Sequence, residues 1–191
     1  AEHALGLMLN LLRNIHKSGR EVRYNSWLRE ENRGRELSEI TVGIVGYGNT
    51  GEALAQKLNA LGCTVLFFDK FRKNIPTSFA RESLLDEIGE LADVVSFHIP
   101  LTKENAGIID KTMIESFKKK VILLNVSRGG IMQTGDIIWG LKTGKLSGVG
   151  LDVLENEKLE TLSAEEKSQF DFLTKHPNVI VTPHIAGWTR E

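Results

Sequence analysis

The sequence lacks several features that would assign it to other classes of protein. Its 191 residues include one cysteine, Cys63, so an intramolecular disulfide is excluded and a reducing, cytoplasmic location is expected. No stretch reaches the roughly 18 to 20 apolar residues of a membrane-spanning helix. The formal net charge of −1 provides no field of one sign, so neither a membrane nor a nucleic acid is expected as a partner. No metal site is predicted.

The first residues resemble a signal peptide in their apolar content, but polar residues interrupt them and no cleavage site follows. Their apolar side chains recur at helical spacing instead, which predicts a helix over residues 1–16. Residues 17–38 are charged, carry Tyr24 and Trp27 and have no sustained period, so we expect an extended arm or loop. Residues 1–39 are therefore expected to form a connecting helix and arm, with an apolar helical face and aromatic side chains that contact a second subunit in a homodimer.

From residue 40 onward, short apolar strands alternate with helices. The strands are continuously apolar, as in a sheet covered on both faces. This pattern predicts an α/β fold with a Rossmann-type, doubly wound parallel sheet in three α/β/α layers over residues 40–191, with a flavodoxin-like sheet as the alternative. A capping-box pattern at Ser163 and Glu166 predicts a peripheral helix between residues 155 and 176. The six expected strands are residues 41–45, 64–68, 93–97, 121–125, 147–151 and 179–182, and the other expected helices are residues 50–61, 83–91, 111–117 and 136–143.

A glycine motif, Gly-Tyr-Gly-Asn-Thr-Gly, lies between the first strand and its helix. Gly46 permits a tight turn, Gly48 lets a pyrophosphate approach the backbone, and Gly51 allows the helix to pack closely on the strand. The amino terminus of the helix would then face the phosphates. Framed by a strand and a helix, the motif predicts a dinucleotide site that includes Tyr47, Asn49 and Thr50.

Asp69 ends the next strand, where a carboxylate can accept hydrogen bonds from both hydroxyls of the adenosine ribose and would repel a 2′-phosphate. The sequence therefore predicts NAD rather than NADP. Lys70 and Arg72 stand close enough to weaken this preference, although solvated loop charges are the simpler interpretation of both.

Further polar residues follow the later strands, and the carboxyl ends of parallel strands share one edge of the sheet. His98, Ile99 and Pro100 are expected beside the adenine half of the cofactor, although an isolated histidine here is more often structural. Arg128 can present a planar fork to a substrate carboxylate, with a surface arginine in a turn as the alternative. Asp152 ends the following strand, where its carboxylate could hold the carboxamide of nicotinamide.

Glu157 and His184 are the last two candidate site residues. A glutamate in contact with a histidine fixes the tautomer of the imidazole and stabilises the imidazolium, so the two residues can act as an acid/base pair.

Five motifs in this order, GYGNTG, HIPLT, NVSRGG, LDVLENE and TPHIAG, resemble those of the D-isomer-specific 2-hydroxyacid dehydrogenases over essentially the whole chain. The resemblance implies hydride transfer between NAD(H) and a D-2-hydroxy acid or 2-oxo acid. Arg128 would bind the carboxylate and oxo group, His184 would exchange the proton and Glu157 would support His184. Beyond the residues already named, the implied cofactor contacts include Val126, Ser127 and Gly187.

The sequence departs from the family pattern in two ways. Lys158 replaces the usual proline after the glutamate, and the substrate domain is absent, so we expect an isolated cofactor domain that binds NAD and turns over poorly. The segments Asn-Arg-Gly-Arg-Glu-Leu at residues 32–37 and Leu-Glu-Asn-Glu-Lys at residues 154–158 resemble those of the branch of the family that acts on D-3-phosphoglycerate, in serine biosynthesis. The alternatives are members that act on glycerate, hydroxypyruvate or D-lactate, and an NAD-sensing corepressor-like binding protein. Formate dehydrogenases pair their histidine with glutamine, so Glu157 argues against them.

Overall fold

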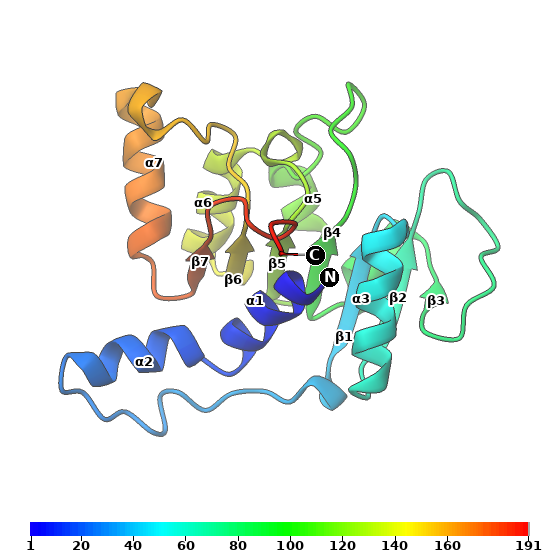
Figure 1. Ribbon diagram of the computed structural model, residues 1–191, viewed down its shortest axis with the longest axis horizontal. Coiled ribbons are helices and arrows are strands. Elements are labelled where there is room, and N and C mark those ends of the chain that lie inside the picture. The colour runs from blue at the N-terminus through cyan, green and yellow to red at the C-terminus, as the bar shows by residue number, and fades with distance from the viewer. Residues whose placement is uncertain (191) are drawn as a thin grey trace.

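A computed structural model describes residues 1–190 and shows one seven-stranded sheet in which every strand pair is parallel. The strand order is β3-β2-β1-β4-β5-β6-β7, so the chain starts near the middle of the sheet and winds outward in both directions. This confirms the doubly wound α/β fold (Figure 1). The strands are β1 (Thr41–Val45), β2 (Thr64–Phe68), β3 (Arg81–Glu82), β4 (Val94–Phe97), β5 (Val121–Asn125), β6 (Leu146–Leu151) and β7 (Val179–Val181).

Helices cover both faces of the sheet and form two hydrophobic cores. One core lies under α1 (Glu2–Leu12) and α3 (Asn49–Ala60). The other lies under α4 (Leu85–Leu91), α5 (Lys111–Ser116), α6 (Thr134–Thr143) and α7 (Ala164–Lys175). The inner strands β4 and β5 are buried along their whole length, as their continuous apolar sequences predict.

Two details of the predicted elements are wrong. A seventh strand, β3, pairs with the outer side of β2, and the six expected strands do not include it. It has two residues, both charged, because a short edge strand needs no apolar pattern to stay in place. The expected helix over residues 1–16 ends earlier, at Leu12. Asn14, two residues further on, has a left-handed conformation with φ 53°.

A separate helix, α2 (Ile15–Arg23), occupies part of the segment that was expected to be an arm or loop. None of its residues is buried. Its two large apolar residues, Ile15 and Val22, lie two turns apart on one face, which is too short a pattern to distinguish a helix from a charged loop. Together with residues 24–36 it projects from the body of the molecule (Figure 1). The segment contacts the body of the molecule again at Arg35, whose N–H donates to the Leu12 carbonyl.

The apolar face of α1 packs against the protein's own sheet. Ala4 and Met8 are fully buried, and Leu7 and Leu12 are nearly so. These buried side chains are not available to a second subunit, and a dimer contact through residues 1–39 stays a prediction. The capping box of α7 is confirmed, since the Ser163 side chain accepts from the Glu166 N–H and the Glu166 carboxylate accepts from the Ser163 N–H.

Candidate functional site

The glycine turn between β1 and α3 leaves its ligand side open. Gly46 has φ +96°, and a Cβ there would lie 2.5 Å from the His98 carbonyl oxygen. A Cβ on Gly51 would lie 2.2 Å from the Gly46 carbonyl oxygen, so α3 approaches the turn as closely as the motif requires. At Gly48 an added Cβ would meet no protein atom within 4 Å. No side chain caps α3, and its first N–H groups are therefore free for an anion. The turn thus fits a pyrophosphate.

The Tyr47 side chain does not line this turn. Its ring is fully buried and stacks on Phe67 with 3.8 Å between ring centroids. Its hydroxyl lies 3.0 Å from Thr77 Oγ1, which ties the turn to the loop after β2. Only the backbone of Tyr47 is placed where the predicted cofactor contact could form.

Asp69 lies directly after β2, buried, at the expected end of the strand. Its carboxylate accepts hydrogen bonds from the N–H groups of Tyr47, Phe71 and Arg72, at 2.8 to 2.9 Å. Burial on its own would raise the pKa of Asp69, but these three N–H donors and the Arg72 charge outweigh burial and lower the pKa below its ordinary value. The group is therefore a fixed anion that joins the glycine turn to the loop.

Arg72 is more than a solvated charge, because its guanidinium donates to the Tyr47 carbonyl. Arg72 therefore contacts both Asp69, through its backbone N–H, and Tyr47, whose own N–H donates to Asp69. Lys70 is exposed and lies over the Phe71 ring, as expected for a loop charge.

The residues after β4, β5 and β7 meet in one cleft of about 1120 Å³. Those predicted from the sequence are Thr50, His98, Ile99, Pro100, Val126, Ser127, Arg128, His184 and Gly187. Ala1, Leu101, Ala186 and Trp188 line the cleft as well. The structure therefore brings both chemical groups, Arg128 and His184, to the cleft that begins at α3.

His98 is partly buried, and its Nε2 lies 2.8 Å from Ser96 Oγ. Burial lowers the pKa of His98 to about 4. The imidazole is therefore neutral at physiological pH, which suits a wall of the cleft rather than an acid.

Arg128 is exposed at the end of a turn that Asn125 shapes. The fully buried Asn125 side chain donates to the Arg128 carbonyl at 3.0 Å and accepts from both the N–H and the hydroxyl of Ser127. The guanidinium donates to the Ser127 carbonyl at 2.7 Å and is otherwise free to bind an anion in the part of the chain that the structure describes. Sequence reasoning missed Asn125; a buried polar residue that ends an apolar strand was the available signal.

His184 and Glu157 form the expected pair. His184 Nδ1 lies 2.9 Å from Glu157 Oε2, although 27 residues separate them. Both side chains are almost half exposed, at 45% and 43%. With Nδ1 facing the glutamate, Nε2 is left for a ligand. The pair also lines a second cavity of about 310 Å³, so it stands between that cavity and the cleft.

Asp152 is fully buried after β6. Its carboxylate accepts from the Thr182 hydroxyl and from the N–H groups of Ile185 and Ala186, at 2.5, 3.0 and 2.7 Å. It therefore fixes the turn that carries His184, and its contact with a nicotinamide carboxamide stays a prediction. Thr182 was missed because a threonine that ends a strand carries no distinctive signal.

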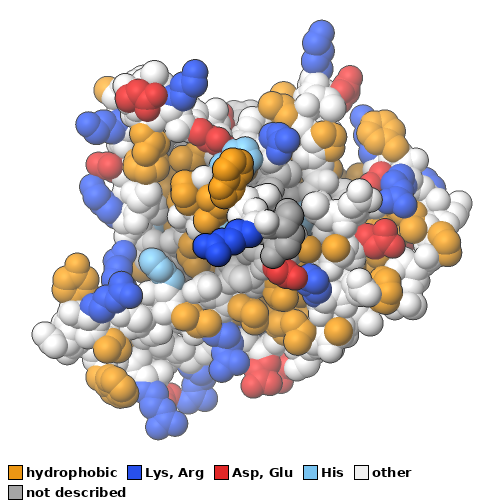
Figure 2. Space-filling view, viewed as in Figure 1, with side chains coloured by type: hydrophobic (Ala, Val, Ile, Leu, Met, Phe, Trp, Pro, Cys, Tyr) orange, Lys and Arg blue, Asp and Glu red, His pale blue; other side chains and the backbone are white. Residues whose placement is uncertain are grey.

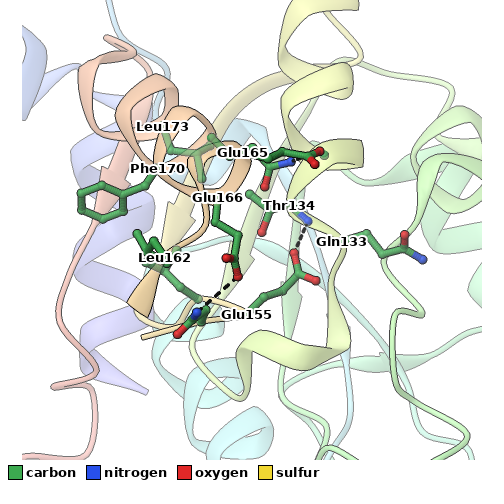
Figure 3. A pocket seen from close by; sticks show the side chains of 12 residues that line it. Gln133, Thr134, Glu155, Leu162, Glu165, Glu166, Phe170 and Leu173 are labelled. Atoms are coloured by element: carbon green, nitrogen blue, oxygen red, sulfur yellow. Dashed lines mark hydrogen bonds between the residues drawn. The ribbon is translucent and has the colours of Figure 1, made fainter. Parts of the chain in front are cut away.

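A further pocket of about 380 Å³ lies between α6, α7 and the loop before α7, and shares no lining residue with the cleft (Figure 3). Two glutamates around it serve local structure: Glu155 accepts from the Thr134 N–H at the start of α6, and Glu166 caps α7. Neither Glu157 nor His184 lines this pocket, although it shares Leu154 and Phe170 with the 310 Å³ cavity beside that pair.

The doubly wound sheet, the open glycine turn, the buried anion after β2 and the Glu157–His184 pair define the cofactor-binding domain of a dinucleotide-dependent dehydrogenase. Residues 5–186 match the model of the D-isomer specific 2-hydroxyacid dehydrogenase NAD-binding domain, and the chain belongs to this family. It is an NAD-binding domain, as predicted from Asp69.

Known relatives agree on the family and differ in substrate. The chain is 35% identical to a D-specific alpha-keto acid dehydrogenase of Enterococcus faecalis, over 99% of this chain and 59% of that protein. It is 36% identical to the D-3-phosphoglycerate dehydrogenase of Bacillus subtilis, over 100% of this chain and 35% of that protein. The structure of a D-lactate dehydrogenase from Aquifex aeolicus, complexed with NAD and lactic acid, superimposes with a TM-score of 0.91 at 30% identity, covering 99% of this chain and 60% of that one. The chain thus spans between about a third and three fifths of their lengths.

Proposed function

We propose that this chain is the cofactor-binding and acid/base half of an NAD-dependent enzyme that interconverts a D-2-hydroxy acid and its 2-oxo acid. The observation that carries the proposal is the Glu157–His184 pair at 2.9 Å, whose histidine lines the same cleft as Arg128 and Thr50 of the glycine motif. The family and its relatives support the same reaction class.

Arg128, His184 and Glu157 have different roles in this reaction. Among the residues that the structure describes, Arg128 is the one arginine that lines the cleft, and its planar fork suits the carboxylate and the polarised oxo group of a substrate. His184 takes the hydroxyl proton in oxidation and returns it to the oxo oxygen in reduction, through Nε2. Glu157 orients the ring and stabilises its charged form. Bound NAD supplies the hydride acceptor, and the glycine turn, Asp69 and the α3 amino terminus are the groups that would hold it.

Among substrates we favour D-3-phosphoglycerate, in a cytoplasmic enzyme of serine biosynthesis. Its support is the sequence variants in the segment before β1 and after Glu157 and the match to the Bacillus enzyme. The D-lactate and alpha-keto acid dehydrogenases among the relatives make pyruvate and longer 2-oxo acids the alternatives.

Two measurements test this proposal. Titration of this chain with NADH and NADPH in parallel, followed by the fluorescence of Trp188 in the cleft, is expected to show preferential NADH binding. The full-length protein is then assayed with NADH against 3-phosphohydroxypyruvate, hydroxypyruvate, pyruvate and 2-oxoisocaproate. Turnover of none of these by a protein that binds NADH would favour the corepressor-like alternative.

We also propose that α2 and the arm form a homodimer contact. Tyr24 and Trp27 are exposed by 78% and 83%, and hydrophobic side chains gather over the projecting α2 region in Figure 2. A groove of about 230 Å³ lies beside them, lined by Val22 and Leu28 among others. Such an apolar projection is typical of a surface that another subunit covers.

A further inference from the structure

A chain of hydrogen bonds runs beneath the turn that carries His184 and ends on α1. His3 Nε2 lies 2.8 Å from Thr182 Oγ1 and 3.3 Å from Asp152 Oδ1. The Thr182 hydroxyl lies 2.5 Å from the same Asp152 oxygen. His3 is 179 residues away from Thr182 in sequence, and its side chain is only 21% exposed. The contact therefore joins the first turn of α1 to the end of β7.

The partners determine the direction of each bond. Asp152 accepts from Thr182, so the single hydroxyl proton of Thr182 is committed to the carboxylate. The hydroxyl oxygen can then only accept from His3, which assigns a proton to His3 Nε2. That N–H also points toward Asp152, whose charge strengthens the bond.

The anion at the centre of this chain holds the catalytic turn. Asp152 accepts the N–H groups of Ile185 and Ala186, the two residues that follow His184. His184 itself has φ +56°, a conformation that costs a residue with a side chain roughly 1 kcal/mol or more and persists only when its surroundings impose it. The bonds on both sides of His184, at Thr182 and at Ile185, are what imposes it here.

We propose that His3 is a positioning residue for His184: through Thr182 and Asp152 it fixes the strained turn that presents the imidazole to the cleft. The inference rests on the proposed function in assigning the proton transfer to His184. α1 provides a rigid base for this task, because its neighbouring side chains Ala4, Leu7 and Met8 are buried against the sheet. His3 acts through the turn and does not line the cleft.

Amide hydrogen exchange in this chain tests the positioning directly. His3→Ala removes the donor, and Thr182→Val removes the hydroxyl with little change of shape. Loss of one such bond is worth about 1 kcal/mol or slightly more, so we expect the Ile185 and Ala186 amides to exchange about five- to tenfold faster in either variant. The double variant should exchange no faster than the more affected single one, because both remove the same chain of bonds. His3→Gln, which retains an N–H donor, should restore much of the protection.

His16→Ala is the matched control, since His16 is exposed on α2 and takes no part in the hydrogen bonds that Thr182 and Asp152 make at this turn. Its Ile185 and Ala186 amides should exchange as in the wild type. Unchanged exchange in both His3→Ala and Thr182→Val would overturn the proposal. Equal loss of protection in β4 and β5 would also overturn it, because His3 would then stabilise the whole domain rather than the turn.

Kinetics of the full-length protein test the consequence for catalysis. In His3→Ala we expect kcat to fall roughly ten- to a hundredfold through misplacement of the imidazole, with the Kd for NADH unchanged and kcat recovered in His3→Gln. A change in the NADH Kd with kcat preserved would contradict this. If the wild type binds NADH but reduces no 2-oxo acid, the proposed function fails, while the exchange measurement still decides the role of His3 in the turn.

Discussion

At the scale of single residues, Asp69 and Glu157 both act through contacts that fix a charge in place. Three backbone N–H groups hold Asp69, and His184 faces Glu157. In each case the carboxylate is arranged before any ligand arrives, which lowers the cost of binding or proton transfer. Substitutions at these two positions should therefore affect different steps.

Asp69→Ala is expected to weaken NADH binding. A hydrogen bond to a charged group is worth about 1.5 to 3 kcal/mol, which corresponds to a loss of roughly ten- to a hundredfold in affinity. NADPH binding should weaken less, because the repulsion of a 2′-phosphate disappears as well. Fluorescence titration of both nucleotides measures this, with Asp86→Ala, an exposed acid on α4, as the control. Equal losses for NADH and NADPH would argue against a ribose contact.

Glu157→Gln is expected to lower kcat of the full-length enzyme without changing the Kd for NADH. The glutamine keeps a similar shape but no longer stabilises the imidazolium of His184, so kcat should fall by about a hundredfold. Steady-state kinetics with a 2-oxo acid at saturating NADH measure kcat, and fluorescence titration measures the Kd. A kcat equal to that of the wild type would refute this role.

At the scale of secondary-structure elements, side chains cap the amino termini of two helices. α7 begins with the reciprocal capping box that the sequence predicts, and α5 is preceded by its N-cap Asp110, whose carboxylate accepts from the Met113 N–H at 2.8 Å. α3 begins without a side-chain cap, as do α1, α2, α4 and α6. Because the first N–H groups of α3 directly follow the glycine turn, they are placed to bind an anionic ligand in the position of a cap.

Ser163→Ala is expected to lower the free energy of unfolding by about 1 kcal/mol, the usual cost of a lost cap. The exposed Ser78, which lies in the loop after β2, provides the control Ser78→Ala. Urea denaturation followed by circular dichroism compares the two variants. NADH affinity should not change in either, since α7 does not line the cleft; a loss of affinity in Ser163→Ala would contradict the separation of this helix from the site.

At the scale of the whole molecule, a few contacts between distant segments hold the arm and the sheet together. The Asp93 carboxylate accepts from the Thr41 N–H, from Arg35 of the arm and from Lys119, at 2.9, 3.0 and 3.2 Å. Burial on its own would raise the pKa of Asp93, but these partners lower it below its ordinary value. Asp93 thus joins three segments at the amino-terminal edge of the sheet, opposite the cleft.

Asp93→Asn is expected to destabilise the protein at neutral pH by about 1 to 2 kcal/mol. Because the folded-state pKa is depressed, the stabilisation is present above the unfolded pKa of about 3.9 and is lost as the pH falls through the folded pKa. The stability curves of wild type and variant should therefore converge in acid. Urea denaturation between neutral and acidic pH measures this, and curves that stay parallel would exclude an electrostatic origin.

Trp27→Glu is expected to convert a dimer into a monomer, because it places a charge in the apolar surface of the arm. Analytical ultracentrifugation at micromolar concentration compares it with Leu84→Glu, a charge at an exposed apolar position away from the arm. A wild type that is already monomeric would remove the dimer proposal.

No helix in the described part of the chain is long and apolar enough to cross a membrane. Side chains of both charges are mixed over the face seen in Figure 2, in keeping with the small net charge. The function of the molecule therefore depends on the local geometry of the cleft rather than on a long-range field.

The sequence by itself determined the six longer strands, the glycine turn and the order of the polar residues at the strand ends. These features are local, since apolar runs, turn residues and helix caps act over a few positions of the chain. Tertiary structure decided what depends on long-range contact. It added β3 at the sheet edge, formed α2 in a charged segment that buries no residue, and buried the face of α1 against the sheet. It also gave Asp69 three backbone donors and brought His3 to Thr182, across almost the whole chain. Such contacts leave no periodic signal in the sequence, because their partners become neighbours only when the sheet has assembled.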